Sequence, residues 1–156
     1  MVAKIGIDIC NTIADVNECI RQALNPPDAC FKEYGLSRYG IDEEWFTKHL
    51  ELFAEAKPMP GAVEALDILA SGGIEIYYLT ARPEKARGIT VEWLKRWGFP
   101  EVRLIMTREK DEAAKELGLG LVMEDAPPEI AKLEKVGIDV VIYRQPYNKG
   151  MFTWEK

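Results

Sequence analysis

The sequence predicts an α/β protein: a Rossmann-like, doubly wound parallel sheet of about five strands, with a small helical cap inserted after strand one. Three observations predict this fold. Five short apolar runs have strand length. Amphipathic segments that begin at proline and end at glycine lie between the later runs, as is typical of helices. Strands that are apolar almost throughout and alternate with helices favour a parallel sheet covered on both faces.

The predicted strands are, in chain order, Val2–Ile9, Ile74–Leu79, Val102–Met106, Leu121–Met123 and Ile138–Tyr143. Between them the apolar spacing predicts a helix that carries Val63, Leu66 and Ala70 and ends at Gly72-Gly73, followed by helices over Pro83–Trp97, Glu109–Leu117 and Pro128–Val136. The stripe expected to be buried in the first of these three is Ala86, Ile89, Trp93, Leu94 and Trp97, and the stripe in the third is Ile130, Leu133 and Val136.

The interval over residues 14–60 has no strand pattern and is predicted to be a helical cap insert within a single domain over residues 1–156. Its apolar residues fall into two helical stripes, separated by Asn25-Pro26-Pro27. We therefore expect two helices that cross above the sheet. The stripes are Val16, Ile20 and Leu24, then Trp45, Phe46, Leu50 and Phe53.

Composition excludes several classes of protein and partner. The chain has 156 residues, 47% of them hydrophobic, and a formal net charge of −6 without a basic cluster, which argues against binding to a nucleic acid polymer or an anionic membrane. No run approaches the roughly 20 apolar residues of a membrane span, and no signal peptide is visible. The three cysteines, at positions 10, 19 and 30, form no CxxC pair, which favours a reducing compartment. We expect a cytoplasmic monomer or homodimer.

The candidate site follows from the rule that ligands of open α/β sheets bind beyond the carboxyl ends of the strands. The first strand ends near Asp8 and is followed by Ile9-Cys10-Asn11-Thr12, the second ends near Thr80-Ala81-Arg82, and the fourth ends near Glu124-Asp125. These side chains are expected to converge on one site.

Their chemistry suits phosphoryl transfer. Asp8 is the candidate nucleophile toward phosphorus, while backbone N–H groups of the turn after it hold phosphoryl oxygens. Crowded carboxylates need a cation, and an all-oxygen set formed by Asp8, Glu124 and Asp125 suits Mg²⁺. Thr80 can donate a hydrogen bond to phosphate, and a lysine ahead of the fourth strand can balance negative charge. Lys110 is the first choice and Lys115 the second.

Four segments in order resemble the motifs of the haloacid dehalogenase-like phosphohydrolases. They are IGIDICNTIAD, IYYLTARPE, REKDEAAKELG and LVMEDAPPE, and together they span nearly the whole chain. The closing segment VVIYRQPYN and the short helical insert are most similar to the deoxyribonucleotidase group of that superfamily, the cytosolic 5′(3′) type.

The resemblance implies roles for these residues. Asp8 would be the aspartyl nucleophile, Thr80 the hydroxyl of the second motif and Lys110 the lysine of the third. Mg²⁺ would be bound by Asp8, the backbone carbonyl of Cys10, Glu124 and Asp125, and the insert would close over a small phosphorylated substrate, with a nucleotide as one possibility. The residues expected to bind phosphate or substrate are Asn11, Thr12, Thr80, Ala81, Arg82 and Lys110.

Cys10 departs from the family pattern, because phosphatases of this family carry a second aspartate there that protonates the leaving oxygen and activates water. A thiol is a poor substitute, and general acid–base catalysis is typically worth about 10²–10⁴-fold in rate. Three alternatives stay open: a protein that binds a phosphorylated ligand without efficient turnover, a dehalogenase-type hydrolase, and a cysteine phosphatase. The last requires an arginine six positions after Cys10, where the chain has Val16.

The remaining aromatic residues of the insert have two interpretations. Tyr34, Trp45, Phe46 and Phe53 could stack on a nucleobase, but stripes at helical spacing are more often core. His49, the one histidine, is expected to pack rather than to catalyse, and Asp15 and Asn17 either face the cleft or cap the helix that follows.

Overall fold

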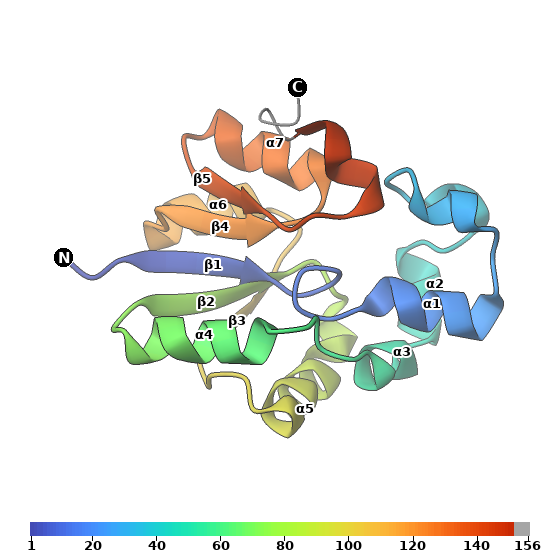
Figure 1. Cartoon of the computed structure of the whole chain (residues 1–156), viewed down its shortest axis with the longest axis horizontal. Helices are drawn as coiled ribbons and strands as arrows, with labels where there is room; N and C mark the ends of the chain where they lie inside the picture. Colours follow the sequence, from blue (N-terminus) through green and yellow to red (C-terminus); the bar gives the residue numbers. More distant parts are fainter. Residues whose placement is uncertain (152–156) are drawn as a thin grey trace.

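The computed structural model describes residues 1–151 and contains a five-stranded parallel sheet. The spatial order of the strands is β3-β2-β1-β4-β5, with β1 at the centre (Figure 1). Each predicted apolar run forms one strand with slightly shifted ends, so the predicted fold class is confirmed. The strands are β1 (Lys4–Asp8), β2 (Glu75–Thr80), β3 (Arg103–Met106), β4 (Leu121–Glu124) and β5 (Asp139–Ile142).

The strand order brings the predicted site residues to one edge. β1 pairs with β2 on one side and with β4 on the other, so that Asp8 lies opposite Leu79 and Ile7 opposite Met123. The chain adds β2 and β3 on one side of β1, and then β4 and β5 on the other side. Such a switch point opens a crevice at the carboxyl ends of the strands.

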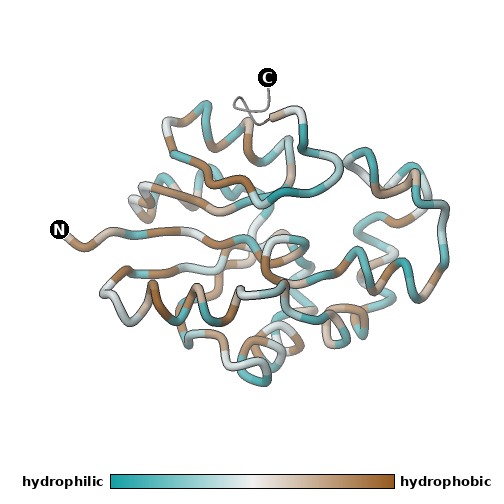
Figure 2. Tube along the Cα trace, in the orientation of Figure 1, coloured by the Kyte–Doolittle hydropathy of each residue, from teal (hydrophilic) through white to brown (hydrophobic). Residues whose placement is uncertain are grey.

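Helices cover both faces of the sheet and enclose two apolar clusters. α4 (Ala62–Ser71) and α5 (Arg87–Trp97) pack on the face that carries Ile5, Ile7, Ile76 and Tyr78. α6 (Lys110–Leu117) and α7 (Pro127–Lys135) pack on the opposite face. Figure 2 shows the hydrophobic colouring concentrated along the strands that these helices cover.

Gly6 lets the apolar side chains on the α6 and α7 face of the sheet approach the centre of β1. A Cβ atom at this position would lie 2.9 Å from Leu119 Cδ1, 3.0 Å from Leu79 Cδ1 and 3.1 Å from Val122 Cγ2. Any larger side chain would therefore push these neighbours apart.

The insert contains three α-helices instead of the two predicted. They are α1 (Val16–Leu24), α2 (Glu43–Lys48) and α3 (Glu51–Glu55), and they lie beyond the carboxyl ends of the strands (Figure 1). The second predicted stripe breaks at His49, whose backbone leaves the helical region at φ −130° and ψ 47°. The side chains of Asp15 and Asp42 accept hydrogen bonds from the first turns of α1 and α2, which fixes where these helices begin.

The two ends of the insert run side by side. Asp15 N donates to Lys57 O at 2.8 Å, and Met59 N donates to Ile13 O at 2.8 Å. A second attachment joins α3 to α5, since the indole Nε1 of the buried Trp93 donates to Ala56 O at 2.6 Å. The insert therefore joins the rest of the molecule through a paired stem and through side contacts such as this one.

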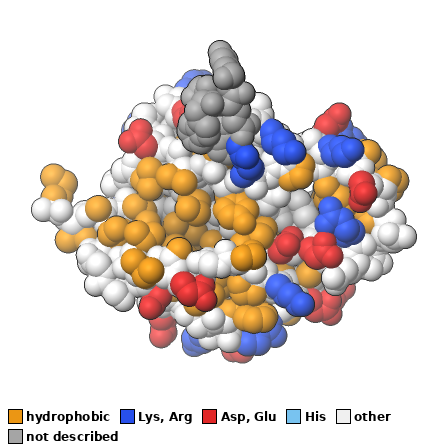
Figure 3. Space-filling view, viewed as in Figure 1, with side chains coloured by type: hydrophobic (Ala, Val, Ile, Leu, Met, Phe, Trp, Pro, Cys, Tyr) orange, Lys and Arg blue, Asp and Glu red, His pale blue; other side chains and the backbone are white. Residues whose placement is uncertain are grey.

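Three residues predicted to lie on buried stripes are exposed. Leu24, Trp97 and Val136 have exposed fractions of 47%, 40% and 38%, because each lies at the end of its helix, where the packed face turns toward solvent. The surface in Figure 3 carries positive and negative side chains interspersed, next to a hydrophobic area over the strands. Across residues 1–151, the helices are too short and too polar to span a bilayer.

Candidate active site

A cavity of about 600 Å³ lies between the carboxyl ends of the strands and the insert. Nine of the predicted site residues line it, and they come from β1, β2, β4, the loops that follow these strands, and the start of α6. They are Asp8, Cys10, Asn11, Thr80, Ala81, Arg82, Lys110, Glu124 and Asp125. Segments far apart in the chain thus meet where the strand-end rule placed them.

Lys110 joins two of the acids. Its Nζ donates to Asp8 Oδ1 at 2.6 Å and to Glu124 Oε2 at 2.8 Å, and the side chains of all three residues are at most 5% exposed. Burial alone would lower the pKa of Lys110, but the negative charges of Asp8 and Glu124 outweigh it and raise this pKa above its ordinary value. Lys110 is therefore a permanent cation at the floor of the cavity.

Asp125 is held by two hydroxyl groups. Thr12 Oγ1 lies 2.9 Å from Asp125 Oδ1 and 3.0 Å from Asp8 Oδ2, and the Tyr147 hydroxyl donates to Asp125 Oδ2. The Thr12 hydroxyl has a single proton, so it donates to one carboxylate at a time. Thr12 was predicted to bind phosphate, but its hydroxyl bridges two acids and does not line the cavity.

Two carboxyl groups of the acidic cluster have raised pKa values. Burial and the negative charge of Asp8 raise the pKa of Glu124 to about 7, and burial followed by the charges of Asp8 and Glu124 raises the pKa of Asp125 well above its ordinary value. Both shifts indicate that burial and repulsion between neighbouring acids disfavour the charged forms of these carboxyl groups.

The donor set fits a divalent cation. Asp8, Glu124 and Asp125 each offer a carboxylate oxygen, and these oxygens lie within 4.8 Å of one another. Hard cations of the Mg²⁺ type take such oxygen ligands. Glu124 has the fewest free lone pairs, because its Oε1 accepts from the backbone N–H groups of Asp125 and Ala126 and its Oε2 accepts from Lys110. Asp8 and Asp125 are thus the better direct ligands.

The turn after β1 is shaped by its backbone. The carbonyl of Ile9 accepts hydrogen bonds from the N–H groups of Thr12, Ile13 and Ala14, and Asn11 has a positive φ of 62°. The Asn11 side chain accepts from Asn17 N at 2.9 Å, so the start of α1 holds this turn. Asparagine tolerates the left-handed region better than most residues, which explains its place here.

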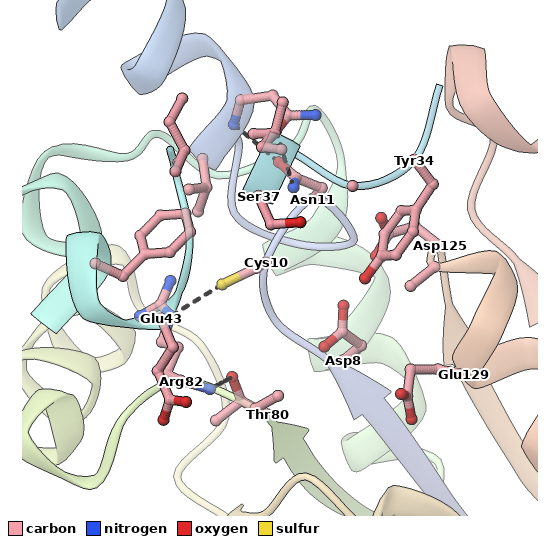
Figure 4. A pocket seen from close by; sticks show the side chains of 18 of the residues that line it. Asp8, Cys10, Asn11, Tyr34, Ser37, Glu43, Thr80, Arg82, Asp125 and Glu129 are labelled. Atoms are coloured by element: carbon pink, nitrogen blue, oxygen red, sulfur yellow. Dashed lines mark hydrogen bonds between the residues drawn. The ribbon is translucent and has the colours of Figure 1, made fainter. Parts of the chain in front are cut away.

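Thr80, Cys10 and Arg82 form the opposite wall of the cavity (Figure 4). Arg82 N donates to Thr80 Oγ1 at 3.3 Å, and Arg82 Nε donates to Cys10 Sγ at 3.2 Å. Burial raises the pKa of the Cys10 thiol, although the positive charge of Arg82 opposes the shift. Cys10 is thus a neutral thiol at neutral pH.

The insert supplies an apolar end to the same cavity. Phe46 and Phe53 line it with their rings stacked at a centroid distance of 5.5 Å, and Tyr34 lines it from the loop between α1 and α2. Trp45 and His49 stack on each other and do not line the cavity. At the rim, Arg108 and Glu43 form an ion pair of 2.5 Å between the insert and the loop before α6.

Sequence reasoning missed the contribution of the segment after β5. Besides Tyr147, which contacts Asp125, Gln145 donates its side-chain Nε2 to Asn11 O at 2.8 Å, and Asn148 donates to Asp125 O at 2.9 Å. The sequence signal was the closing segment VVIYRQPYN, whose resemblance to the deoxyribonucleotidase group assigned no role to Gln145, Tyr147 or Asn148. Lys115, the second choice for the lysine, is exposed on α6 and does not line the cavity.

Comparison with protein families gives a match over much of the chain. Residues 38–155, more than half of the chain, match the family described as 5′ nucleotidase, deoxy (pyrimidine), cytosolic type C protein. Two curated bacterial proteins named "Putative nucleotidase" are also similar. The one from Oceanobacillus iheyensis is 28% identical over 94% of this chain and 89% of its own length. The one from Bacillus cereus is 29% identical over 95% of this chain and 75% of its own length.

Solved structures share the fold. A class C acid phosphatase from Bacillus anthracis superposes with a TM-score of 0.63 at 19% identity, covering 94% of this chain and 67% of that chain. A haloacid dehalogenase-like family hydrolase from Streptococcus pneumoniae superposes with a TM-score of 0.61 at 13% identity, covering 90% and 84%. At such identities the likeness concerns the fold alone.

Proposed function

Since the chain belongs to the cytosolic type C 5′ nucleotidase family of the haloacid dehalogenase-like superfamily, we propose that it is a Mg²⁺-dependent phosphohydrolase of the aspartyl-phosphate type. Its substrate is a small phosphomonoester, and a nucleotide or deoxynucleotide 5′- or 3′-phosphate is the leading candidate. The observation that carries the proposal is the contact of buried Asp8 with Lys110, at 2.6 Å, beside Asp125 at the floor of a 600 Å³ cavity.

Phosphatases of this superfamily generally use a divalent metal, and the acidic cluster fits one. Asp8, Asp125 and the backbone carbonyl of Cys10 would hold Mg²⁺, with Glu124 beside them. When bound, Mg²⁺ supplies positive charge that lowers the repulsion between the carboxylates and an incoming phosphate. Lys110 supplies a second positive charge from the protein itself.

The proposed reaction has two steps. A carboxylate oxygen of Asp8 forms a bond to phosphorus while the bond to the leaving oxygen breaks, and its electron pair stays on that oxygen. Water then attacks the aspartyl phosphate, the bond between phosphorus and Asp8 breaks, and one proton is released to solvent. Lys110 and Thr80 stabilise the phosphoryl oxygens. Of the turn N–H groups expected to hold phosphate, those of Asn11 and Thr12 already donate to Ala14 O and Ile9 O.

The insert over residues 14–60 acts as a cap in this proposal. Support comes from the paired stem at Asp15 and Lys57, and from the ion pair of Arg108 with Glu43 across the rim. The ring of Phe46 offers a stacking surface at the apolar end of the cavity, which suits a nucleobase.

A second candidate function is binding of a phosphorylated ligand without efficient turnover. Cys10 favours it, since a thiol with a raised pKa is a poor proton donor and a poor partner for water. The free state of Cys10, Cys19 and Cys30 supports the further proposal that the protein works in a reducing compartment such as the cytoplasm, as a monomer or homodimer.

The two functions are separated by assays with Mg²⁺ on 4-nitrophenyl phosphate, acetyl phosphate and a nucleotide panel. We expect turnover by the native chain, its loss in Asp8→Ala, and a gain of about 10²–10⁴-fold in Cys10→Asp on substrates with poor leaving groups. Cys19→Asp is the matched control, because Cys19 lies outside the cavity.

Activity that survives Asp8→Ala would refute the nucleophile assignment. If no variant turns over any substrate while a nucleotide raises the unfolding temperature of the native chain, the binding function is correct instead.

A further inference from the structure

Arg82, which was predicted to bind phosphate or substrate, is a buried cation that the two proposed reaction steps do not use. It follows β2 directly, and only 5% of its surface is exposed. Its Nε donates to Cys10 Sγ, and its Nη1 donates to Thr90 Oγ1 at 3.0 Å. The guanidinium also lies over the ring of Phe53, 4.3 Å from the ring centroid. These contacts fix its position from three sides.

The third nitrogen of Arg82, Nη2, has no hydrogen-bond partner and is itself buried. Among residues 1–151, no carboxylate lies within ion-pair distance of this guanidinium. Arginine stays charged in proteins, and a buried charge without a partner is costly. A structure that keeps such a group indicates that an anion binds there for part of the working cycle.

The position of Arg82 selects which anion this is. Arg82 and Cys10 line the same cavity as Asp8, on the side away from Asp125 and Glu129 (Figure 4). In an in-line displacement the leaving oxygen lies opposite the attacking oxygen across phosphorus. The leaving oxygen therefore points away from Asp8 into the cavity, and Arg82, Cys10 and Phe53 line one wall of that cavity.

We propose that Arg82 is a catalytic residue that stabilises the leaving oxygen as an anion by donating a hydrogen bond from Nη2, so that the first step needs no proton donor. This inference rests on the proposed function. Asp8 bonds to phosphorus, the bond from phosphorus to the leaving oxygen breaks, and its electron pair becomes a negative charge beside the guanidinium. Solvent protonates the leaving group after release.

The proposal specifies a substrate preference. A group that stabilises an anion without giving it a proton leaves the rate dependent on how stable that anion is. Acyl, enol and aryl phosphates should therefore turn over fastest, and alkyl phosphates, nucleotides among them, depend most strongly on Arg82.

The kinetic test compares native protein with Arg82→Met on two esters, 4-nitrophenyl phosphate and phenyl phosphate. Phenol is the weaker acid, so its oxygen carries more charge that needs stabilising. We expect Arg82→Met to lower kcat/KM on phenyl phosphate by about 10²-fold, the usual cost of removing one donor from a developing oxyanion, and at least tenfold less on 4-nitrophenyl phosphate. Arg82→Lys keeps the positive charge, so its kcat/KM values should lie between those of native protein and those of Arg82→Met.

A binding test does not need turnover. Native protein loaded with magnesium and inorganic phosphate should bind 4-nitrophenolate, the leaving group itself, at least tenfold more tightly than Arg82→Met does, as measured by equilibrium dialysis at a pH where the phenol is ionised. Arg96→Met is the matched control, because Arg96 also contacts an aromatic ring and a backbone carbonyl but lies outside the cavity.

Each outcome decides one question. Equal losses of kcat/KM on both esters, or equal phenolate binding by native protein and Arg82→Met, would overturn the role of Arg82. If the native chain hydrolyses neither ester but binds phenolate through Arg82, the anion site stands and the proposed function fails. Thermal unfolding of Arg82→Met and Arg82→Lys verifies that both variants fold.

Discussion

Replacing Lys110 with methionine tests the electrostatic centre of the site. Methionine keeps most of the side-chain volume and removes the ammonium that lies 2.6 Å from Asp8 and 2.8 Å from Glu124. Two buried carboxylates then face each other without a counter-charge. Breaking a buried ion pair by removing one partner typically costs about 3–5 kcal/mol. At roughly 2–4 °C per kcal/mol for a chain of this size, the unfolding temperature should fall by roughly 6–20 °C.

The loss of stability in Lys110→Met should appear at every pH near neutrality, because the pKa of Lys110 is raised above its ordinary value of 10.5. A raised lysine pKa means that the stabilisation is fully present below the unfolded value and is lost only as pH rises through the folded value. The assay is calorimetry at pH 7 in the presence of a chelator. Saturating Mg²⁺ should recover part of the loss, because the cation supplies the missing positive charge.

Lys132→Met is the matched control, because Lys132 contacts Glu129 at 3.4 Å with 47% of its side chain exposed. Such surface pairs contribute about 0–1 kcal/mol. A loss below about 1 kcal/mol in Lys110→Met would refute the claim that this lysine holds the acidic cluster together.

Three further predictions concern the metal and the packing. Asp125→Asn should abolish the stabilisation by Mg²⁺ that thermal unfolding measures. For native protein this stabilisation reaches about 2.7 kcal/mol at a Mg²⁺ concentration of 100 times Kd, and an equal stabilisation of the variant would contradict the role of Asp125 as a ligand. Gly6→Ala should cost about 1–3 kcal/mol in urea unfolding, because its methyl group would meet Leu119 at 2.9 Å. Trp93→Phe should cost about 1–3 kcal/mol by the same measurement, since Ala56 O loses its donor; an unchanged midpoint would show that the side contact of the insert is unimportant.

The sheet and its helices were predictable because local signals determine them. Apolar runs such as Ile74–Leu79 contain the residues that two covered faces demand, and Gly98 and Gly118 mark helix ends through positive φ values of 78° and 68°. The strand-end rule then brought Asp8 and Asp125 together without any knowledge of tertiary contacts.

The insert and the closing segment were less predictable, since tertiary contacts decide them. The stripe from Trp45 to Phe53 has helical spacing, but the chain bends at His49, and no local pattern marks that bend. Tyr147 reaches Asp125 only because the chain returns after β5, and Arg82 could not be known to lack an acidic partner until its neighbours were placed.

The paired stem at residues 13–15 and 57–59 bears on how this architecture can diversify. Because the two ends of the insert are hydrogen-bonded neighbours, the intervening chain closes a loop whose entropy changes only slowly with its length, by about 0.6 kcal/mol for each doubling. Residues can be gained or lost in exposed stretches such as Asn25–Pro27 without moving Asp8 or Lys110. Selection could thus change which ligand the insert accepts while the residues for phosphoryl chemistry at the strand ends stay in place.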